Sequence, residues 1–265
     1  MFPKTKVSEK DFQVITEKNV SFLPEYMIKN ALNRIIITPS ENGIGWNSNY
    51  LPNLEPFNFI EELSVHWTKI DNIKGIEVCK NVKTLLLDNG DKTFIDFREF
   101  HKLERVFSWD RKGIEKIWNI PTLKDLSLAG LKRNHFQNGI ALDTLEKLRI
   151  IQTPLEDISF LLRGKNIYFL ELLGMSKLDN LDIIGNMTNL THLGIEANKV
   201  RDFSFIRNLI NLERCFLCSK SSEMCLEDFL NFKKIKSLNI SGNEKTRIIN
   251  RAIDEFYNFN EFPKS

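Results

Sequence analysis

The chain has 265 residues, 42% of them hydrophobic, and its 37 basic and 35 acidic residues give a formal net charge of +2. Because positive and negative charges nearly cancel, the net charge does not favour binding to nucleic acid or to an anionic membrane. Apolar runs such as residues 35–37 are far shorter than the roughly 20 residues that a membrane-spanning helix needs, so we expect a soluble protein.

Residues 1–59 show no clear repeat. The amino terminus lacks the apolar core of a secretory signal, so we expect a cytoplasmic location. Residues 32–37 favour a divergent first strand, and residues 42–49 have the turn-forming composition of a loop. Because a stack of repeats exposes apolar surface at its first copy, we predict that residues 1–59 form an amino-terminal cap.

From Ile60 onward the sequence repeats. The clearest copy, residues 190–200, has apolar residues at its first, fourth, sixth and eleventh places and asparagine at its ninth, the spacing LxxLxLxxNxL. Copies follow one another at intervals of 20 to 23 residues, a period that indicates a repeat architecture. Their first residues are Ile60, Val82, Leu103, Leu123, Leu145, Ile167, Leu190, Leu212 and Ile235.

This spacing resembles that of the leucine-rich repeat family, in its short, bacterial-type class, over roughly residues 60–243. The resemblance implies an α/β fold: a curved, right-handed superhelical solenoid with terminal caps. A parallel β-sheet would line its concave face, and short helical or irregular segments its convex face. It also implies a binding surface rather than a reaction. In each copy the first, fourth and sixth residues are expected to point into the core.

The convex segments and the ninth places show where repeats vary. Residues 156–160 and 201–205 carry Asp and Ser, which favour the starts of short helical turns. Only two copies keep asparagine at the ninth place, Asn198 and Asn243. We therefore expect distorted repeats around three other ninth-place residues, Arg111, Leu131 and Lys220.

The carboxyl end of the chain predicts a second cap. Apolar residues at 248, 249, 252, 253 and 256 have helical spacing. We predict a capping helix within residues 244–265, laid across the last of about nine repeats in residues 60–243.

Residues at the third, fifth, seventh and eighth places should point away from the core. Strands about 4.8 Å apart would bring these columns together. In the first three regular repeats, residues at these places form an aromatic and acidic cluster. Clusters of this kind are found in protein interfaces. The predicted protein-binding residues are His66, Trp67, Leu86, Asp88, Asn89, Phe107, Trp109, Asp110, Ile151 and Leu173. Alternatively, the amino-terminal segment covers the rings, or they pack on one another.

A ladder of charges follows the same face. Arg105, Asp125 and Lys147 succeed one another at the third place, and Arg149 meets Glu171 at the fifth. We interpret the ladder as structural, because an exposed ion pair contributes only about 0 to 1 kcal/mol.

No motif indicates catalysis, a metal or another cofactor. Cys215 and Cys218 form a CxxC, but the register places one inward and the other outward, on opposite faces of a strand. His66 and His192 are six repeats apart, and the sequence has no HExxH, GxSxG or Walker-type loop. The sequence therefore indicates neither an enzyme nor a small-molecule substrate.

The leading hypothesis is a non-enzymatic module that binds a protein on its concave face. Trp67, Phe107 and Trp109 would be the anchors, and Asp88 and Asp110 would set the charge preference. Richness in Ile, Asn, Lys and Phe indicates an A/T-rich, bacterial genome. There the chain would be an immunity protein that blocks a toxin domain. The alternatives are a regulatory adaptor or scaffold unrelated to toxins, and a cryptic hydrolase, which would need a deep polar pocket.

Overall fold

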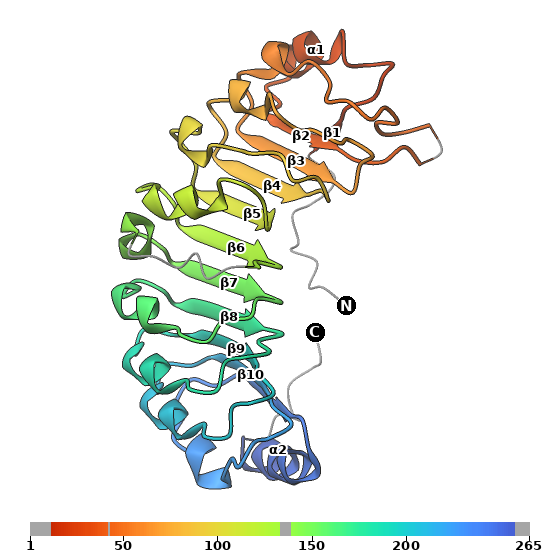
Figure 1. Cartoon of the computed structure of the whole chain (residues 1–265). Coiled ribbons are helices and arrows are strands. Elements are labelled where there is room, and N and C mark those ends of the chain that lie inside the picture. Colours follow the sequence, from red (N-terminus) through yellow and green to blue (C-terminus); the bar gives the residue numbers. More distant parts are fainter. Residues whose placement is uncertain (1–11, 42, 133–138, 258–265) are drawn as a thin grey trace. The chain divides into compact units, whose positions relative to one another are not determined.

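The computed structural model describes residues 12–41, 43–132 and 139–257. The chain divides into two compact units, residues 1–117 and residues 118–265. In each unit, parallel strands follow one another in sequence order, with short helices in the connections between them (Figure 1). Among the described residues, no helix combines the length and the apolar character that crossing a membrane requires.

Among its described residues, the first unit contains five parallel strands, with the α-helix α1 between the first two. The strands are β1 (Gln13–Val14), β2 (Arg34–Ile37), β3 (Glu62–His66), β4 (Thr84–Asp88) and β5 (Arg105–Trp109), and the helices are α1 (Leu23–Lys29), η2 (Glu55–Phe57), η3 (Ile76–Val78) and η4 (Phe97–Glu99). The divergent strand predicted in residues 32–37 is confirmed as β2, which pairs with β3 through Ile37 and Val65. Short β1 then adds to the other side of β2.

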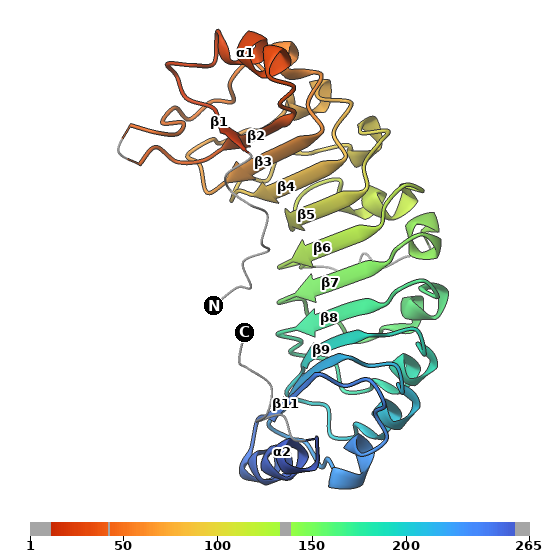
Figure 2. The same ribbon diagram turned by 180° about the vertical axis from the view of Figure 1, so that it is seen from behind.

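The second unit contains six parallel strands with 3₁₀ helices in their connections (Figure 2). The strands are β6 (Asp125–Ala129), β7 (Lys147–Ile151), β8 (Phe169–Leu173), β9 (His192–Glu196), β10 (Arg214–Cys218) and β11 (Ser237–Ser241). The 3₁₀ helices are η6 (Ile140–Asp143), η7 (Ser159–Arg163), η8 (Asp182–Asn186), η9 (Ser204–Asn208) and η10 (Leu226–Phe229), while η5 (Ile114–Asn119) spans the boundary between the units.

The predicted carboxy-terminal helix is confirmed as α2 (Glu244–Tyr257), which packs against β11. Ile249 and Ile253 are buried, and the hydroxyl of Tyr257 donates a hydrogen bond of 2.6 Å to the carbonyl oxygen of Phe229. Residues 258–265 of the predicted cap lie outside the described residues.

Side chains alternate between the two faces of the sheet, which confirms that the fourth and sixth residues of a repeat point inward. In the first unit Leu63 pairs with Leu85 and Val65 with Leu87, and all four side chains are fully buried. The register places like residues of successive repeats beside each other, because every strand pairs at the same place in its copy. Fifth-place and seventh-place residues therefore share the opposite face of the sheet, which we call the open face.

The connections follow the predicted local chemistry. The carboxylate of Asp157 accepts a hydrogen bond of 2.8 Å from the backbone N–H of Ser159, at the start of η7. Asp202 accepts the corresponding bond of 2.7 Å from Ser204 at the start of η9. Each carboxylate satisfies a backbone donor that the first turn leaves without an internal partner.

Backbone irregularity lies at the carboxyl ends of some strands. Gly130 has a φ of 63° beside Leu131, where a distorted repeat was expected. Trp67 and Gln152, directly after β3 and β7, have φ values of 45° and 50°. The sequence did not predict these two left-handed residues.

Truncation of neighbouring residues on β4 tests this alternation. Leu87→Ala should lower the free energy of unfolding by about 2–5 kcal/mol, because it removes a fully buried side chain. Leu86→Ala, on the open face, should cost less than about half as much, because Leu86 is only partly buried. Chemical denaturation followed by circular dichroism measures both. Equal losses would contradict the assignment of faces.

Candidate functional site

Six of the predicted binding residues lie together on the open face of the first unit. His66 pairs in register with Asp88 across β3 and β4, and Leu86 pairs with Phe107 across β4 and β5. We call this group the Asp88 patch, and its members are His66, Trp67, Leu86, Asp88, Phe107 and Trp109.

The carboxylate of Asp88 organises the patch. Its Oδ1 accepts a hydrogen bond of 2.6 Å from Nε1 of Trp109, and its Oδ2 lies 3.7 Å from Nδ1 of His66. Burial raises the pKa of Asp88, but hydrogen bonding to His66, Trp109 and Trp67 outweighs burial and holds that pKa below its ordinary value. Asp88 therefore carries a negative charge at neutral pH.

Trp67 is the most exposed large apolar residue of the patch. The residue is 73% exposed, and its backbone has a φ of 45°, in the left-handed region. A left-handed backbone costs a residue with a side chain roughly 1–2 kcal/mol. The conformation is held by the backbone N–H of Trp67, which donates a hydrogen bond of 2.7 Å to the carbonyl oxygen of Asp88. The exposure argues against the alternative that the amino-terminal segment, in its described part, covers this ring.

Asn89 does not face outward as predicted, because it is only 1% exposed. Its amide nitrogen donates hydrogen bonds of 3.1 Å to the carbonyl oxygen of Ile70 and 3.0 Å to Oδ2 of Asp91. Its amide oxygen accepts a bond of 2.9 Å from the hydroxyl of Thr68. Asp88, the last residue of β4, lies on the open face, so the alternation of side chains turns the next residue, Asn89, toward the interior. The outward position predicted from its eighth place in the repeat is therefore wrong.

The remaining predicted residues lie apart from the patch. Ile151 pairs with Leu173 on the open face of the second unit, as its seventh place predicts, but it is only 7% exposed, whereas Leu173 is partly exposed. Asp110 follows β5 and is partly exposed, and its carbonyl oxygen accepts a hydrogen bond of 2.8 Å from Nζ of Lys92.

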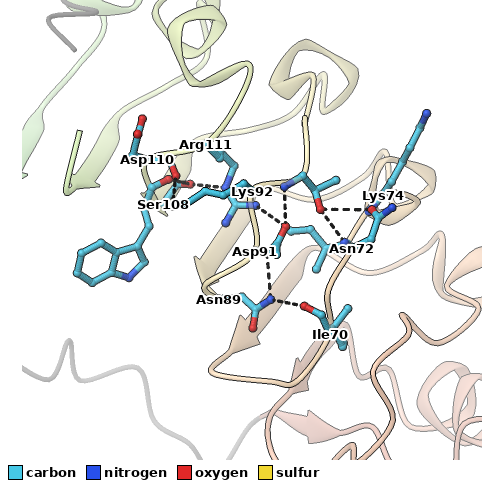
Figure 3. Close-up of polar contacts among 12 residues, drawn as sticks. Ile70, Asn72, Lys74, Asn89, Asp91, Lys92, Ser108, Asp110 and Arg111 are labelled. Atoms are coloured by element: carbon cyan, nitrogen blue, oxygen red, sulfur yellow. Dashed lines mark hydrogen bonds and ion pairs between the residues drawn. The ribbon is translucent and has the colours of Figure 1, made fainter. Parts of the chain in front are cut away.

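A buried polar network lies in the connections that follow β4 and β5 (Figure 3). Nε of Arg111 donates a hydrogen bond of 3.0 Å to the hydroxyl of Ser108, and its Nη1 lies 3.5 Å from Oδ1 of Asp91. Both side chains of this ion pair are fully buried. Burial lowers the pKa of Arg111, and Asp91 opposes that effect. Through Asn89 the network reaches Ile70, so it ties together the three connections that flank Trp67, Asp88 and Trp109.

The second unit has its own polar cluster on the open face. The predicted pairing of Arg149 with Glu171 is confirmed as a hydrogen-bonded ion pair. Nε2 of His192 lies 3.0 Å from Oε1 of Glu171, and the His192 ring stacks on Phe169 with centroids 4.0 Å apart. The guanidinium of Arg149 lies over the same Phe169 ring. These groups satisfy one another, in agreement with the structural interpretation of the charges.

The cysteines lie as the register predicts. Cys215 is 4% exposed, whereas Cys218 is partly exposed on the other face of β10. Burial raises the pKa of Cys215 and raises the pKa of Cys79 to about 12, so both thiols are protonated at neutral pH. In the part of the chain that the structure describes, no three His, Cys, Asp or Glu side chains are grouped so that they could hold a metal ion.

Neither a family model nor a curated protein matches the sequence. Solved structures do match. A leucine-rich repeat protein of Leptospira interrogans has a TM-score of 0.59 and 19% identity, over 89% of this chain and 66% of that one. An internalin of Listeria monocytogenes has a TM-score of 0.56 and 15% identity, over 83% of this chain and 72% of that one. Internalin C2 of the same species has a TM-score of 0.53 and 19% identity, over 86% of this chain and 99% of that one. The chain has the leucine-rich repeat solenoid fold that its spacing predicts.

The Arg111–Asp91 pair gives a test of the network. Asp91→Ala should lower the free energy of unfolding by about 3–5 kcal/mol, because it leaves the buried guanidinium unpaired. Adding Arg111→Met to that variant should restore much of the loss, since both charges are then gone. Denaturant unfolding of the two single variants and the double variant measures the coupling. Additive losses would show that the two side chains do not interact.

Proposed function

We propose that this chain is a non-enzymatic protein-interaction module whose partner binds the open face of the first unit over the Asp88 patch. One observation carries the proposal: Trp67 is 73% exposed while its backbone is held in a left-handed conformation. Backbone strain that the surrounding structure maintains is concentrated at functional sites. Here the strain presents a large aromatic ring to solvent instead of burying it.

The chemistry of the patch supports a protein partner. Trp is enriched among the residues that contribute most to binding energy, and such residues lie within a ring of less important contacts. Leu86 pairs with Phe107, both are partly exposed, and Trp109 follows Phe107 by two residues on β5, so apolar side chains lie on the same face as Asp88. A sheet face that presents an exposed aromatic side chain suits a protein surface better than a small molecule, which usually binds in a pocket.

The finer proposal is a bacterial, cytoplasmic immunity protein that neutralises a toxin domain by covering its active surface. Composition supports the bacterial setting, and the solved structures that share the fold include proteins of Listeria monocytogenes and Leptospira interrogans. A regulatory adaptor or scaffold unrelated to toxins would use the same patch. A toxin gene beside the gene for this chain, and protection of cells that express that toxin, would support immunity over an adaptor role.

Alanine substitutions test the patch directly. The tagged chain is used to recover its partner from the native host, the partner is identified by mass spectrometry, and its affinity is then measured by calorimetry. Trp67→Ala and Trp109→Ala should each weaken binding by about 10-fold or more, because each truncates an aromatic anchor. Phe216→Ala is the matched control, since Phe216 is a 38% exposed aromatic residue on β10 of the second unit.

The control should bind as the unchanged chain does, and all three variants should keep the circular dichroism spectrum of a folded protein. Full affinity of both Trp variants would exclude the Asp88 patch as the binding site. Loss in Phe216→Ala alone would move the site to the second unit.

A further inference from the structure

Half-buried carboxylates on the open face differ in what neutralises them. Glu62 on β3 pairs with Arg34, at 2.8 Å between Nη2 and Oε1. Glu171 on β8 pairs with Arg149. Asp88 is comparably buried, with 20% of its side chain exposed, yet within the described residues no lysine or arginine lies within 4.0 Å of its carboxylate. Its polar neighbours there are the indoles of Trp109 and Trp67 and the imidazole of His66.

This difference constrains any protein that covers the patch. Asp88 is bonded to Trp109 and adjoins Trp67, so a partner that buries either indole removes the carboxylate from water as well. Removing a carboxylate from water is costly unless an opposite charge and further hydrogen bonds replace the lost solvation. Indole donors stabilise a negative charge but do not neutralise it. A partner with an apolar or acidic contact at this point would bind poorly.

Building on the proposed function, we propose that the partner supplies the missing positive charge: an arginine or lysine side chain that binds the Asp88 carboxylate beside Trp67. The exposed indole of Trp67 suits the same side chain, because a guanidinium or ammonium group is attracted to the face of a Trp ring. Arginine fits best, since its planar group can bond a carboxylate and stack on a ring together.

The charged groups around Asp88 leave room for this assignment. His66 lies beside it on β3, and Asp110 adds a second acidic residue after β5. Lys92, in the connection after β4, directs its ammonium group to the carbonyl oxygen of Asp110, with a hydrogen bond of 2.8 Å. The alternative source of positive charge is protonation of His66, which would make binding stronger at acidic pH without any basic residue in the partner.

Peptides selected from a random library on the full-length chain test the inference without knowledge of the natural partner. Binders whose affinity falls in the Trp67→Ala variant identify the patch. Those binders should contain an arginine or lysine, and replacing an arginine by citrulline, which is uncharged and similar in shape, should weaken binding at least 10-fold. Asp88→Asn keeps an acceptor for Trp109 and should weaken the parent peptides equally.

A double-mutant cycle makes the contact specific. The citrulline peptide should lose no further affinity in Asp88→Asn, because the interaction is already absent. Glu196→Gln is the control, since it neutralises an exposed carboxylate at the end of β9 and should leave affinity unchanged.

The inference fails if Trp67-dependent peptides lack basic residues and bind Asp88→Asn as tightly as the unchanged chain. It also fails if such peptides bind more tightly as the pH falls, because His66 then provides the charge. In both cases the proposed function stands. If peptides bind but none depends on Trp67 or Trp109, the patch is not a binding site and both proposals fail.

Discussion

Every feature described above depends on one constraint, the shared register of neighbouring parallel strands. Within each unit, the strands of successive repeats pair at the same place in the repeat, as Val65 does with Leu87 and Leu128 does with Ile150. Side chains alternate between two faces along a strand, so this register stacks the fourth and sixth residues of each copy into a continuous core. It also stacks the fifth and seventh residues on the open face. Residues about 22 positions apart thereby become neighbours.

The Asp88 patch combines an exposed surface with a buried polar support. After β3 the chain turns left-handed at Trp67, and after β5 it places the charged Arg111 inside the protein. Arg111 and Asp91 are fully buried, and Asn89 joins them to the connection after β3. These buried contacts link the connections on either side of the patch to one another.

The sequence predicted the features that repeat. Its period located the strands from β3 onward, the apolar run at residues 32–37 predicted β2, and helical spacing predicted α2. The fifth-place column predicted the ion pair of Arg149 with Glu171. These predictions succeeded because alternation and helical spacing are properties of neighbouring residues. The sequence failed where the strands end. Asn89 was placed outward because the leucine-rich repeat pattern puts the eighth place on that face, yet it follows outward-facing Asp88 and is buried.

Two further failures have the same origin. The ion pair of Arg111 with Asp91 joins two connections whose paths no periodic pattern describes. The left-handed backbone of Trp67 leaves no mark in composition, since glycine or asparagine is the usual residue in that conformation. The places of residues in the repeat thus predicted which side chains gather in the patch. Their hydrogen bonds and backbone conformations could be described only from the structure. The assignment of Ile151 to the surface failed for a simpler reason, because a seventh-place residue of the second unit is buried.

The central claim is that the partner contacts the open face of the first unit at Trp67. Photocrosslinking tests it most directly, with benzoylphenylalanine placed at position 67, where it replaces one exposed aromatic residue by another, or at exposed Ile210 in the connection after η9. Irradiation of the complex should crosslink the partner from position 67 and not from position 210. A crosslink from position 210 with none from position 67 would contradict the account.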